Sequence, residues 1–170
     1  RRLVESCNHY AEYGAGESTL FVATQSNATI RSIETDQRWV DLVNKTLPRK
    51  AEVQRVDLGP TGRWGRPDTF SKAENFRTYL TAPFAGDYSP DLILIDGRFR
   101  VACFMASLLY ARPGTRIVFD DYVNRPFYHI AESVISGDSV GPRQAIFTRP
   151  EAIDEDRVQY LMEKFEFVMD

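Results

Sequence analysis

Three carboxylates in this chain of 170 residues stand where they could act together on one ligand. Asp96 ends the apolar run DLILID at residues 91–96, and Asp120 and Asp121 follow a second apolar run at residues 115–119. Both runs are typical of buried parallel strands, and the spacing of about two dozen residues suits a strand-helix-strand crossover. Since parallel strands place their carboxyl ends at one edge of the sheet, we expect the three side chains to converge.

Converging carboxylates raise one another's pKa values unless a cation lies between them. A hard divalent ion such as Mg²⁺ binds oxygen ligands and keeps waters that a substrate can displace. Asp96, Asp120 and Asp121 are therefore candidate metal ligands. Arg98 and Arg100 offer an alternative source of positive charge, and the sequence leaves both interpretations open.

A second chemical feature is the stretch YAEYGAGESTL at residues 10–20. It predicts a strand that ends at Tyr13, a turn built on Gly14 and Gly16, and a helix entered at Ser18 or Thr19. Glycine allows a positive φ or a close approach of the backbone to a ligand, and Ser or Thr caps a helix. This order forms the ligand cradle of an open α/β sheet, although a glycine turn without any ligand is the alternative.

The charge of this turn narrows the choice of ligand. A dinucleotide-binding turn has a third glycine and faces a pyrophosphate, which Glu12 and Glu17 would repel, so an NAD-dependent oxidoreductase is disfavoured. S-adenosylmethionine (SAM) carries a sulfonium and an ammonium but no phosphate, and Glu12 suits its cationic end. Glu34 ends an expected strand at residues 29–34, 18 residues beyond Gly16, where a carboxylate can accept both ribose hydroxyls.

The run EYGAG at residues 12–16 resembles the E-x-G-x-G first motif of the class I SAM-dependent methyltransferases. The resemblance implies an α/β, Rossmann-like fold for residues 1–170 as a single domain: a mostly parallel sheet with helices on both faces and an antiparallel edge strand. It also implies that Asp57, at the end of a third strand expected at residues 53–57, reaches the adenine amino group, although Asp often only begins a turn. The expected cofactor-binding residues are Glu12, Gly14, Ala15, Gly16, Ser18, Thr19, Glu34, Asp57 and Asp96.

Asp96 together with the run DDY at residues 120–122 resembles the metal site of Mg²⁺-dependent O-methyltransferases, especially those acting on macrolide sugars. In those families the metal holds two substrate oxygens and acidifies the hydroxyl that attacks the methyl group. The chain departs from the pattern at residues 97–100, where GRFR replaces an acidic continuation. The resemblance implies methyl transfer to a small hydroxylated acceptor. The candidate catalytic groups are Asp96, Asp120 and His129.

Three ring-bearing side chains near these features have two interpretations each. His129 could be a general base or an outer metal ligand, but a lone helical histidine among aromatic residues more often only packs. Trp39 lies in an expected helix capped by Asp36, and its spacing favours a place in the core over a role as a platform for the cofactor. Trp64, in the Gly- and Pro-rich loop at residues 58–68, could cover the adenine or line an acceptor pocket, or be a buried anchor of a surface loop.

Further elements complete the expected order. Residues 71–74 (SKAE) form a candidate capping box for a helix through Leu80, and residues 144–148 read as a late edge strand. A terminal amphipathic helix follows Asp154, and its apolar stripe predicts packing on the sheet or a homodimer surface. The stripe consists of Val158, Leu161, Met162 and Phe165.

Composition excludes several classes of function. Net charge is −3 and basic residues are scattered, so we expect no nucleic-acid partner. No apolar run reaches the roughly 20 residues that span a bilayer. Cys7 and Cys103 are expected to be free thiols, which favours a reducing, cytoplasmic location. A native segment before Arg1 is left open, and a methyltransferase-like module that binds its ligand without turnover is the second functional hypothesis.

Overall fold

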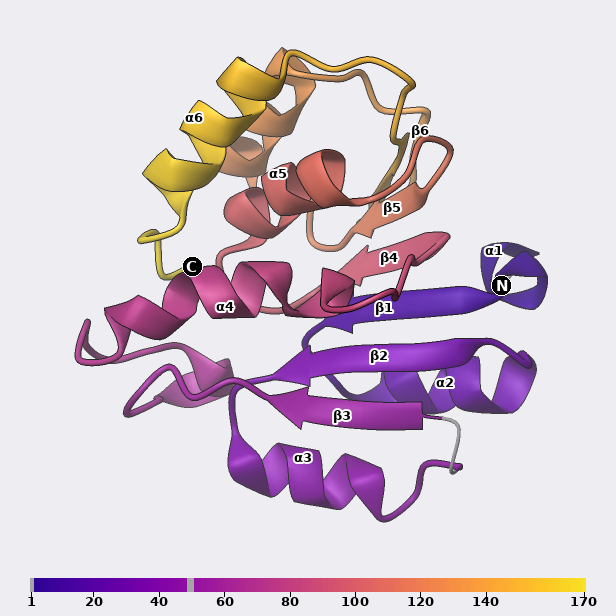
Figure 1. Ribbon diagram of the computed structural model, residues 1–170, viewed down its shortest axis with the longest axis vertical. Helices are drawn as coiled ribbons and strands as arrows, with labels where there is room; N and C mark the ends of the chain where they lie inside the picture. Colours follow the sequence, from indigo (N-terminus) through magenta and orange to yellow (C-terminus); the bar gives the residue numbers. More distant parts are fainter. Residues whose placement is uncertain (1, 49–50) are drawn as a thin grey trace.

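The computed structural model describes residues 2–48 and 51–170, which form a seven-stranded sheet with helices on both faces (Figure 1). Its strands are β1 (His9–Tyr13), β2 (Thr29–Glu34), β3 (Ala51–Arg55), β4 (Leu92–Ile95), β5 (Arg116–Phe119), β6 (Ser139–Val140) and β7 (Ala145–Thr148). Their order in the sheet is β3-β2-β1-β4-β5-β7-β6. Strands β1 to β5 are parallel, whereas β7 is antiparallel to β5 and β6 is antiparallel to β7. The expected mostly parallel, Rossmann-like sheet is confirmed.

The antiparallel end of the sheet differs from the prediction in one respect. Residues 144–148 do supply a late antiparallel strand, β7, but β7 is not the edge. The two-residue strand β6 pairs with its outer side and takes the edge position. A two-residue strand carries too little periodicity to be read from the sequence.

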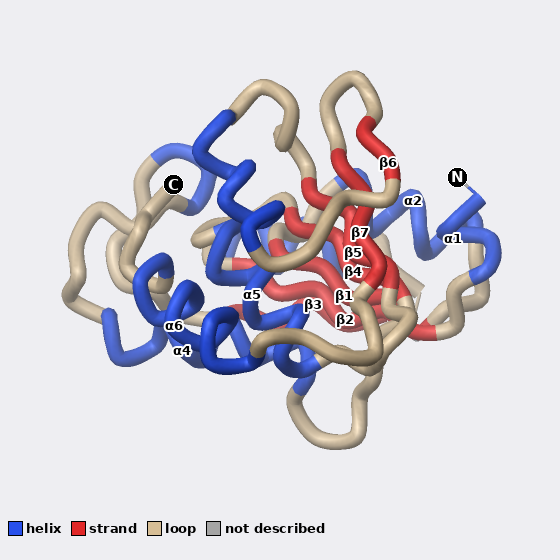
Figure 2. The backbone as a smooth tube through the Cα atoms, turned by 90° about the horizontal axis from the view of Figure 1, so that it is seen from above, coloured by secondary structure: helices blue, strands red, loops and turns tan. Residues whose placement is uncertain are grey.

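The helices divide between the two faces of the sheet, as Figure 2 shows. They are α1 (Arg2–Ser6), α2 (Glu17–Gln25), α3 (Gln37–Asn44), α4 (Phe76–Thr81), α5 (Arg100–Tyr110) and α6 (Glu155–Phe165). Short 3-10 helices are η1 (Arg63–Gly65), η2 (Ala73–Asn75), η3 (Ala82–Phe84) and η4 (Pro126–Ser133). Strand residues alternate between the faces, so Tyr10 packs in the cluster beside α1 and α2 while Ala11 and Tyr13 join the larger core beneath α4 and α5. No helix among these described elements is both long and apolar enough to cross a membrane.

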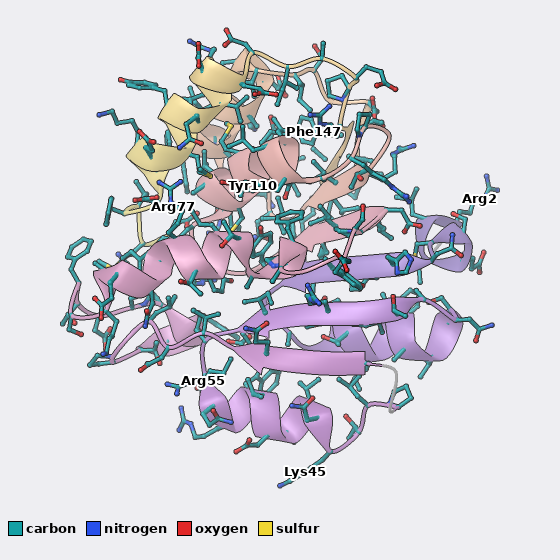
Figure 3. The ribbon with its side chains drawn as sticks, viewed as in Figure 1. Arg2, Lys45, Arg55, Arg77, Tyr110 and Phe147 are labelled. Carbon is teal, nitrogen blue, oxygen red and sulfur yellow. The ribbon has the colours of Figure 1, made fainter. Side chains whose placement is uncertain are left out.

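Helix α5 is the centre of the larger core, because it is buried along most of its length. Phe147 of β7 packs edge-on against its Phe104, with ring centroids 4.8 Å apart (Figure 3). The terminal stripe packs mainly on α5 instead of on the sheet, which leaves its first three members buried. Arg77 of α4 pairs with Glu166 at the end of α6 and ties the two helices together (Figure 3). The stripe is therefore used within the chain and is not a free surface for a homodimer.

The expected capping box at residues 71–74 is wrong. Ser71 contacts the hydroxyl of Thr69, and Glu74 pairs with Lys72 across 3.6 Å, so neither caps a helix. Helix α4 begins only at Phe76, and its N-cap residue, Asn75, makes no side-chain cap. Instead Asn75 donates a hydrogen bond to the Asp57 carbonyl, 2.8 Å away, which anchors the helix start to the end of β3.

Candidate cofactor and carboxylate site

The glycine turn lies at the switch point of the sheet, between the ends of β1 and β4, where open α/β sheets bind ligands. Gly14 has φ +89°, and a Cβ there would lie 2.8 Å from the carbonyl oxygen of Asp96. A Cβ on Gly97 would lie 2.8 Å from the carbonyl carbon of Tyr13. Because the two turns pack backbone against backbone, only glycine fits at either position, and the cradle and the β4 acid become neighbours.

Glu34 joins this cradle from the end of β2. Its Oε2 accepts a hydrogen bond from the Ala15 N–H at 3.1 Å, and its Oε1 accepts one from the Asp36 N–H at 3.0 Å. The indole N–H of Trp39 donates a hydrogen bond to the Ala15 carbonyl. The backbone N–H and the carbonyl of Ala15 are therefore both hydrogen-bonded to side chains of the β2–α3 segment. Sequence reasoning placed Trp39 in the core, which is wrong: the side chain is 43% exposed because α3 buries Val40 instead.

Glu12 lies beneath the turn, where four hydroxyl groups enclose its carboxylate. Tyr10 donates to it at 2.8 Å, Ser18 at 2.7 Å and Ser32 at 2.5 Å, and the Thr19 hydroxyl is the fourth donor. Burial raises the pKa of the Glu12 carboxyl, and these donors oppose the rise. The carboxylate is fully buried, so it holds the turn in place. Its expected interaction with the cationic end of a ligand stays a prediction.

Thr19 connects this buried carboxylate to the turn itself. Its hydroxyl accepts from the Gly16 N–H at 2.9 Å while donating to Glu12. Helix α2 therefore starts at Glu17, earlier than the expected entry at Ser18 or Thr19. Sequence reasoning missed the partner Ser32, although a serine at a buried position of an otherwise apolar strand was a signal for a polar neighbour.

Asp57 lies two residues beyond β3 and is half-exposed at the same edge of the sheet. Its carboxylate pairs with Arg55, 3.0 Å away, at the end of β3 (Figure 3). Trp64 is 75% exposed, so the alternative of a buried tryptophan anchor is wrong. The loop is fixed instead by Gly65, whose carbonyl accepts from the Thr35 hydroxyl at 3.0 Å. This contact brings the tryptophan-bearing loop to the end of β2, which no local pattern in the chain predicts.

The predicted convergence of the three aspartates is confirmed, since one oxygen from each of Asp96, Asp120 and Asp121 lies within 4.8 Å of the others. Burial raises the pKa of Asp96 to about 6, against partial opposition from a neighbouring guanidinium. Burial also acts against ionisation of Asp120, but hydrogen bonds from Gln144 and Arg143 outweigh it and leave the pKa below its ordinary value. As the pH falls, Asp96 therefore takes up a proton before Asp120 does.

Arg100 supplies positive charge from inside the protein, and its side chain is only 4% exposed. Its guanidinium lies 2.8 Å from an Asp96 carboxylate oxygen and donates to the Asp120 carbonyl at 2.9 Å. It also donates to the Gly97 carbonyl at 3.1 Å. Of the two arginines weighed from the sequence, Arg100 is the one at the cluster, because Arg98 reaches the carbonyl of Asp170 instead.

Two further arginines approach the cluster from later parts of the chain. Arg143 pairs with Asp120 and, through its Nε at 2.9 Å, with Asp121. Arg125 pairs with Asp121 at 3.1 Å, and the Gln144 amide donates to Asp120 at 2.6 Å. Sequence reasoning missed these partners, because they lie after β5 and only the fold brings them back to its end.

These contacts show that the donor set does not fit a divalent ion. Three carboxylates meet three guanidinium groups within the described residues, so the fixed charges of the cluster already balance. Mg²⁺ binds bare carboxylate oxygens and water in near-octahedral geometry, whereas these oxygens face arginine and amide donors. The expected metal site at Asp96, Asp120 and Asp121 therefore has no support in this geometry.

His129 lies outside the cluster of carboxylates. Its side chain is exposed, its Nε2 is 3.1 Å from the Tyr122 carbonyl, and its ring stacks on the Tyr122 ring at 4.7 Å. These contacts favour the packing interpretation over a place beside the reacting groups. Among the candidate catalytic groups, Asp120 is almost fully buried, whereas the Asp96 side chain is 37% exposed.

No family model and no curated protein matches the chain, but several solved structures are similar to it. A methyltransferase-like protein from Silicibacter pomeroyi DSS-3 is 29% identical, with a TM-score of 0.81, over 97% of this chain and 90% of that one. An RNA methyltransferase from Salinibacter ruber, solved with S-adenosyl-L-homocysteine, is 18% identical, with a TM-score of 0.53, over 88% of this chain and 85% of that one. An O-methyltransferase family protein from Burkholderia thailandensis is 12% identical, with a TM-score of 0.52, over 88% of this chain and 53% of that one.

The last two similarities are similarities of fold. Together with the sheet order and the glycine turn at the switch point, the matches define a Rossmann-like methyltransferase fold. The chain therefore has the fold of the class I SAM-dependent methyltransferases, which supports the resemblance seen in its sequence. The similarity to the Silicibacter protein extends over nearly the whole of both chains.

Proposed function

We propose that this protein binds SAM along its glycine turn and transfers the methyl group to an oxygen of a small hydroxylated acceptor. One observation carries the proposal: the turn is in backbone contact with Asp96 and hydrogen-bonded to Glu34. The site is thus continuous: Glu34 is the acid for the ribose, the glycine turn is the cradle for the methionine part, and Asp96 is the carboxylate at the reacting end. The Salinibacter protein, which shares the fold, was solved with the demethylated product of SAM.

The residues of the cradle have separate tasks in binding. The carboxylate of Glu34, half-buried at the end of β2, is placed to accept the ribose hydroxyls. The peptide groups of Gly14 to Gly16 are fixed by Glu34, Trp39 and Thr19, so little order has to be gained on binding. Asp57, half-exposed at the neighbouring strand end, is the candidate partner of the adenine amino group. SAM supplies an electrophilic methyl group on a sulfonium.

Asp96 is the group we assign to the acceptor. Its carboxylate is the most exposed member of the cluster, and its pKa of about 6 leaves it mostly ionised at neutral pH. A base with a pKa near the working pH can accept the proton of an attacking hydroxyl during transfer. Alignment of acceptor and methyl group contributes the larger part of the rate in such a reaction. Asp120 is almost fully buried within 4.8 Å of Asp96, and its charge contributes to the raised pKa of that base.

A small molecule suits this site better than a nucleic acid does. Net charge is −3, and the arginines at the cluster are paired with aspartates, so they offer no surface for tracking phosphates. A homodimer also stays a prediction. Its surface would have to lie elsewhere than on the apolar stripe of α6, which α5 covers.

The test is transfer of a radiolabelled methyl group from SAM to a panel of phenolic and sugar hydroxyl acceptors. We expect turnover with at least one hydroxyl acceptor, and a loss of about 10²–10⁴-fold in kcat for Asp96→Asn, which is the usual contribution of a general base. Asp87→Asn is the matched control, because Asp87 is an exposed aspartate in a loop. Binding of S-adenosylhomocysteine without transfer to any acceptor would instead establish a binding module without turnover.

A further inference from the structure

We propose that Arg100 is a built-in cation of the aspartate cluster and takes the place that a divalent ion would need among these carboxylates. The proposal concerns which cation the cluster holds, so it stands whether or not methyl transfer is detected. It rests on three independent features of Arg100: its anchoring, the occupancy of the carboxylate oxygens, and the backbone that aims it.

The guanidinium of Arg100 is anchored by more than ion pairs. It donates to backbone carbonyls of Gly97 at 3.1 Å and of Asp120 at 2.9 Å, on two different strand ends. These carbonyls keep the group in place whatever the charge of the aspartates. A buried guanidinium needs such a complete set of acceptors, because an unpaired buried charge is costly. Arg100 is therefore a fixed part of the site and not a side chain that swings away to admit an ion.

The carboxylate oxygens are correspondingly occupied. Asp96 offers one oxygen to Arg100 at 2.8 Å, and both oxygens of Asp121 face arginine nitrogens, at 2.9 Å for Arg143 and 3.1 Å for Arg125. Both oxygens of Asp120 also have donors, as described above. A divalent ion would have to displace several charge-assisted hydrogen bonds at once, and it would add two positive charges to a cluster that is already neutral.

The backbone next to Arg100 is shaped to aim it at the cluster. Phe99, the residue before it, has φ +53°, a conformation that residues other than glycine rarely adopt. Its ring is buried 4.7 Å from the ring of Phe76, so core packing enforces the conformation. Asp121, which lies 3.5 Å from the guanidinium of Arg100, has φ +56°. Strained residues of this kind are found at functional sites, and here one precedes Arg100 and the other contacts it.

The test compares Mn²⁺ binding by wild-type protein and Arg100→Met. Binding is measured by titration calorimetry and by the change in melting temperature. We expect wild-type protein to show no saturable binding up to about 1 mM, the weak end of protein sites for hard cations. We expect Arg100→Met, which keeps the apolar stem but removes the charge, to bind Mn²⁺ with 1:1 stoichiometry and to melt at a higher temperature with the ion. The added substitution Asp96→Asn should abolish the gain.

Arg98→Met is the matched control, since Arg98 lies in the same segment but contacts Asp170. It should gain no Mn²⁺ binding. Saturable binding to wild-type protein that Asp96→Asn removes would overturn the proposal, and this arm decides even if Arg100→Met does not fold. A folded Arg100→Met that gains no binding would also overturn it. None of these outcomes depends on methyl transfer, so a failure here is distinguishable from a failure of the proposed function.

Discussion

Replacing Gly14 by alanine tests whether the glycine turn and the β4 end depend on backbone contact. Alanine at φ +89° costs about 1–2 kcal/mol from the left-handed backbone alone. Its Cβ would also lie 2.8 Å from the Asp96 carbonyl oxygen and 3.0 Å from the Gly97 Cα. Neither backbone atom can rotate away, so overpacking adds a further 1–3 kcal/mol or so. We expect a total loss of roughly 2–5 kcal/mol in the free energy of unfolding.

Gly114→Ala separates the cost of the left-handed backbone from the cost of overpacking. Gly114 has φ +84°, close to that of Gly14, but an added Cβ would meet no atom within 4 Å. It should lose only the backbone contribution of about 1–2 kcal/mol. For a chain of this size the excess in Gly14→Ala corresponds to a melting temperature lower by about 2–12 °C. Urea unfolding followed by circular dichroism measures both variants, and equal losses would refute the contact on which the site is built.

Three further predictions concern the groups that support the turn and the cluster. Trp39→Phe removes the hydrogen bond to Ala15 and should lower the free energy of unfolding by about 0.5–1.5 kcal/mol. Trp64→Phe, at an exposed position, should change it by no more than about 0.5 kcal/mol. Equal effects of the two substitutions in urea unfolding would contradict the contact assigned to Trp39. Glu12→Ala leaves four hydroxyls without their acceptor and should cost at least about 2 kcal/mol in the same assay, so a neutral variant would argue against its supporting role. Asp96 has its pKa raised in the folded protein to about 6 from 3.8, so its ionisation lowers stability as pH rises from 4 through 6. Asp96→Asn should therefore gain stability relative to wild-type protein over that range, and a difference that does not change with pH would exclude the raised pKa.

The succession of the parallel strands along the chain and the converging aspartates could be predicted, because both follow from local patterns. Apolar runs such as β4 mark buried parallel strands, and parallel strands share one carboxyl edge. Spacing alone therefore predicts that Glu34, at the end of β2, and Asp96, after β4, lie at the same edge of the sheet. The glycine turn was likewise visible, since positive φ and close backbone approach restrict the residue type to glycine.

The partners of these groups could not be predicted, because they depend on contacts over long distances in the chain. Arg143 reaches Asp120 from the segment before β7, and no local pattern links the two. Trp39 was misplaced since the apolar face of a short helix can be read one residue out of phase, and Val40 takes the inward position. The metal interpretation lacks support for the same reason: the motif shows the carboxylates but not the arginines that pair with them.

The most direct test of the central claim is calorimetric titration of the protein with S-adenosylhomocysteine, with Glu34→Ala measured beside wild-type protein. Circular dichroism would confirm that the variant is folded, since Glu34 also accepts hydrogen bonds from the backbone of Thr35 and Asp36. We expect saturable 1:1 binding to wild-type protein that Glu34→Ala weakens strongly, because the ribose loses its acceptor. No binding by wild-type protein, or equal binding by both, would contradict the assignment of this site.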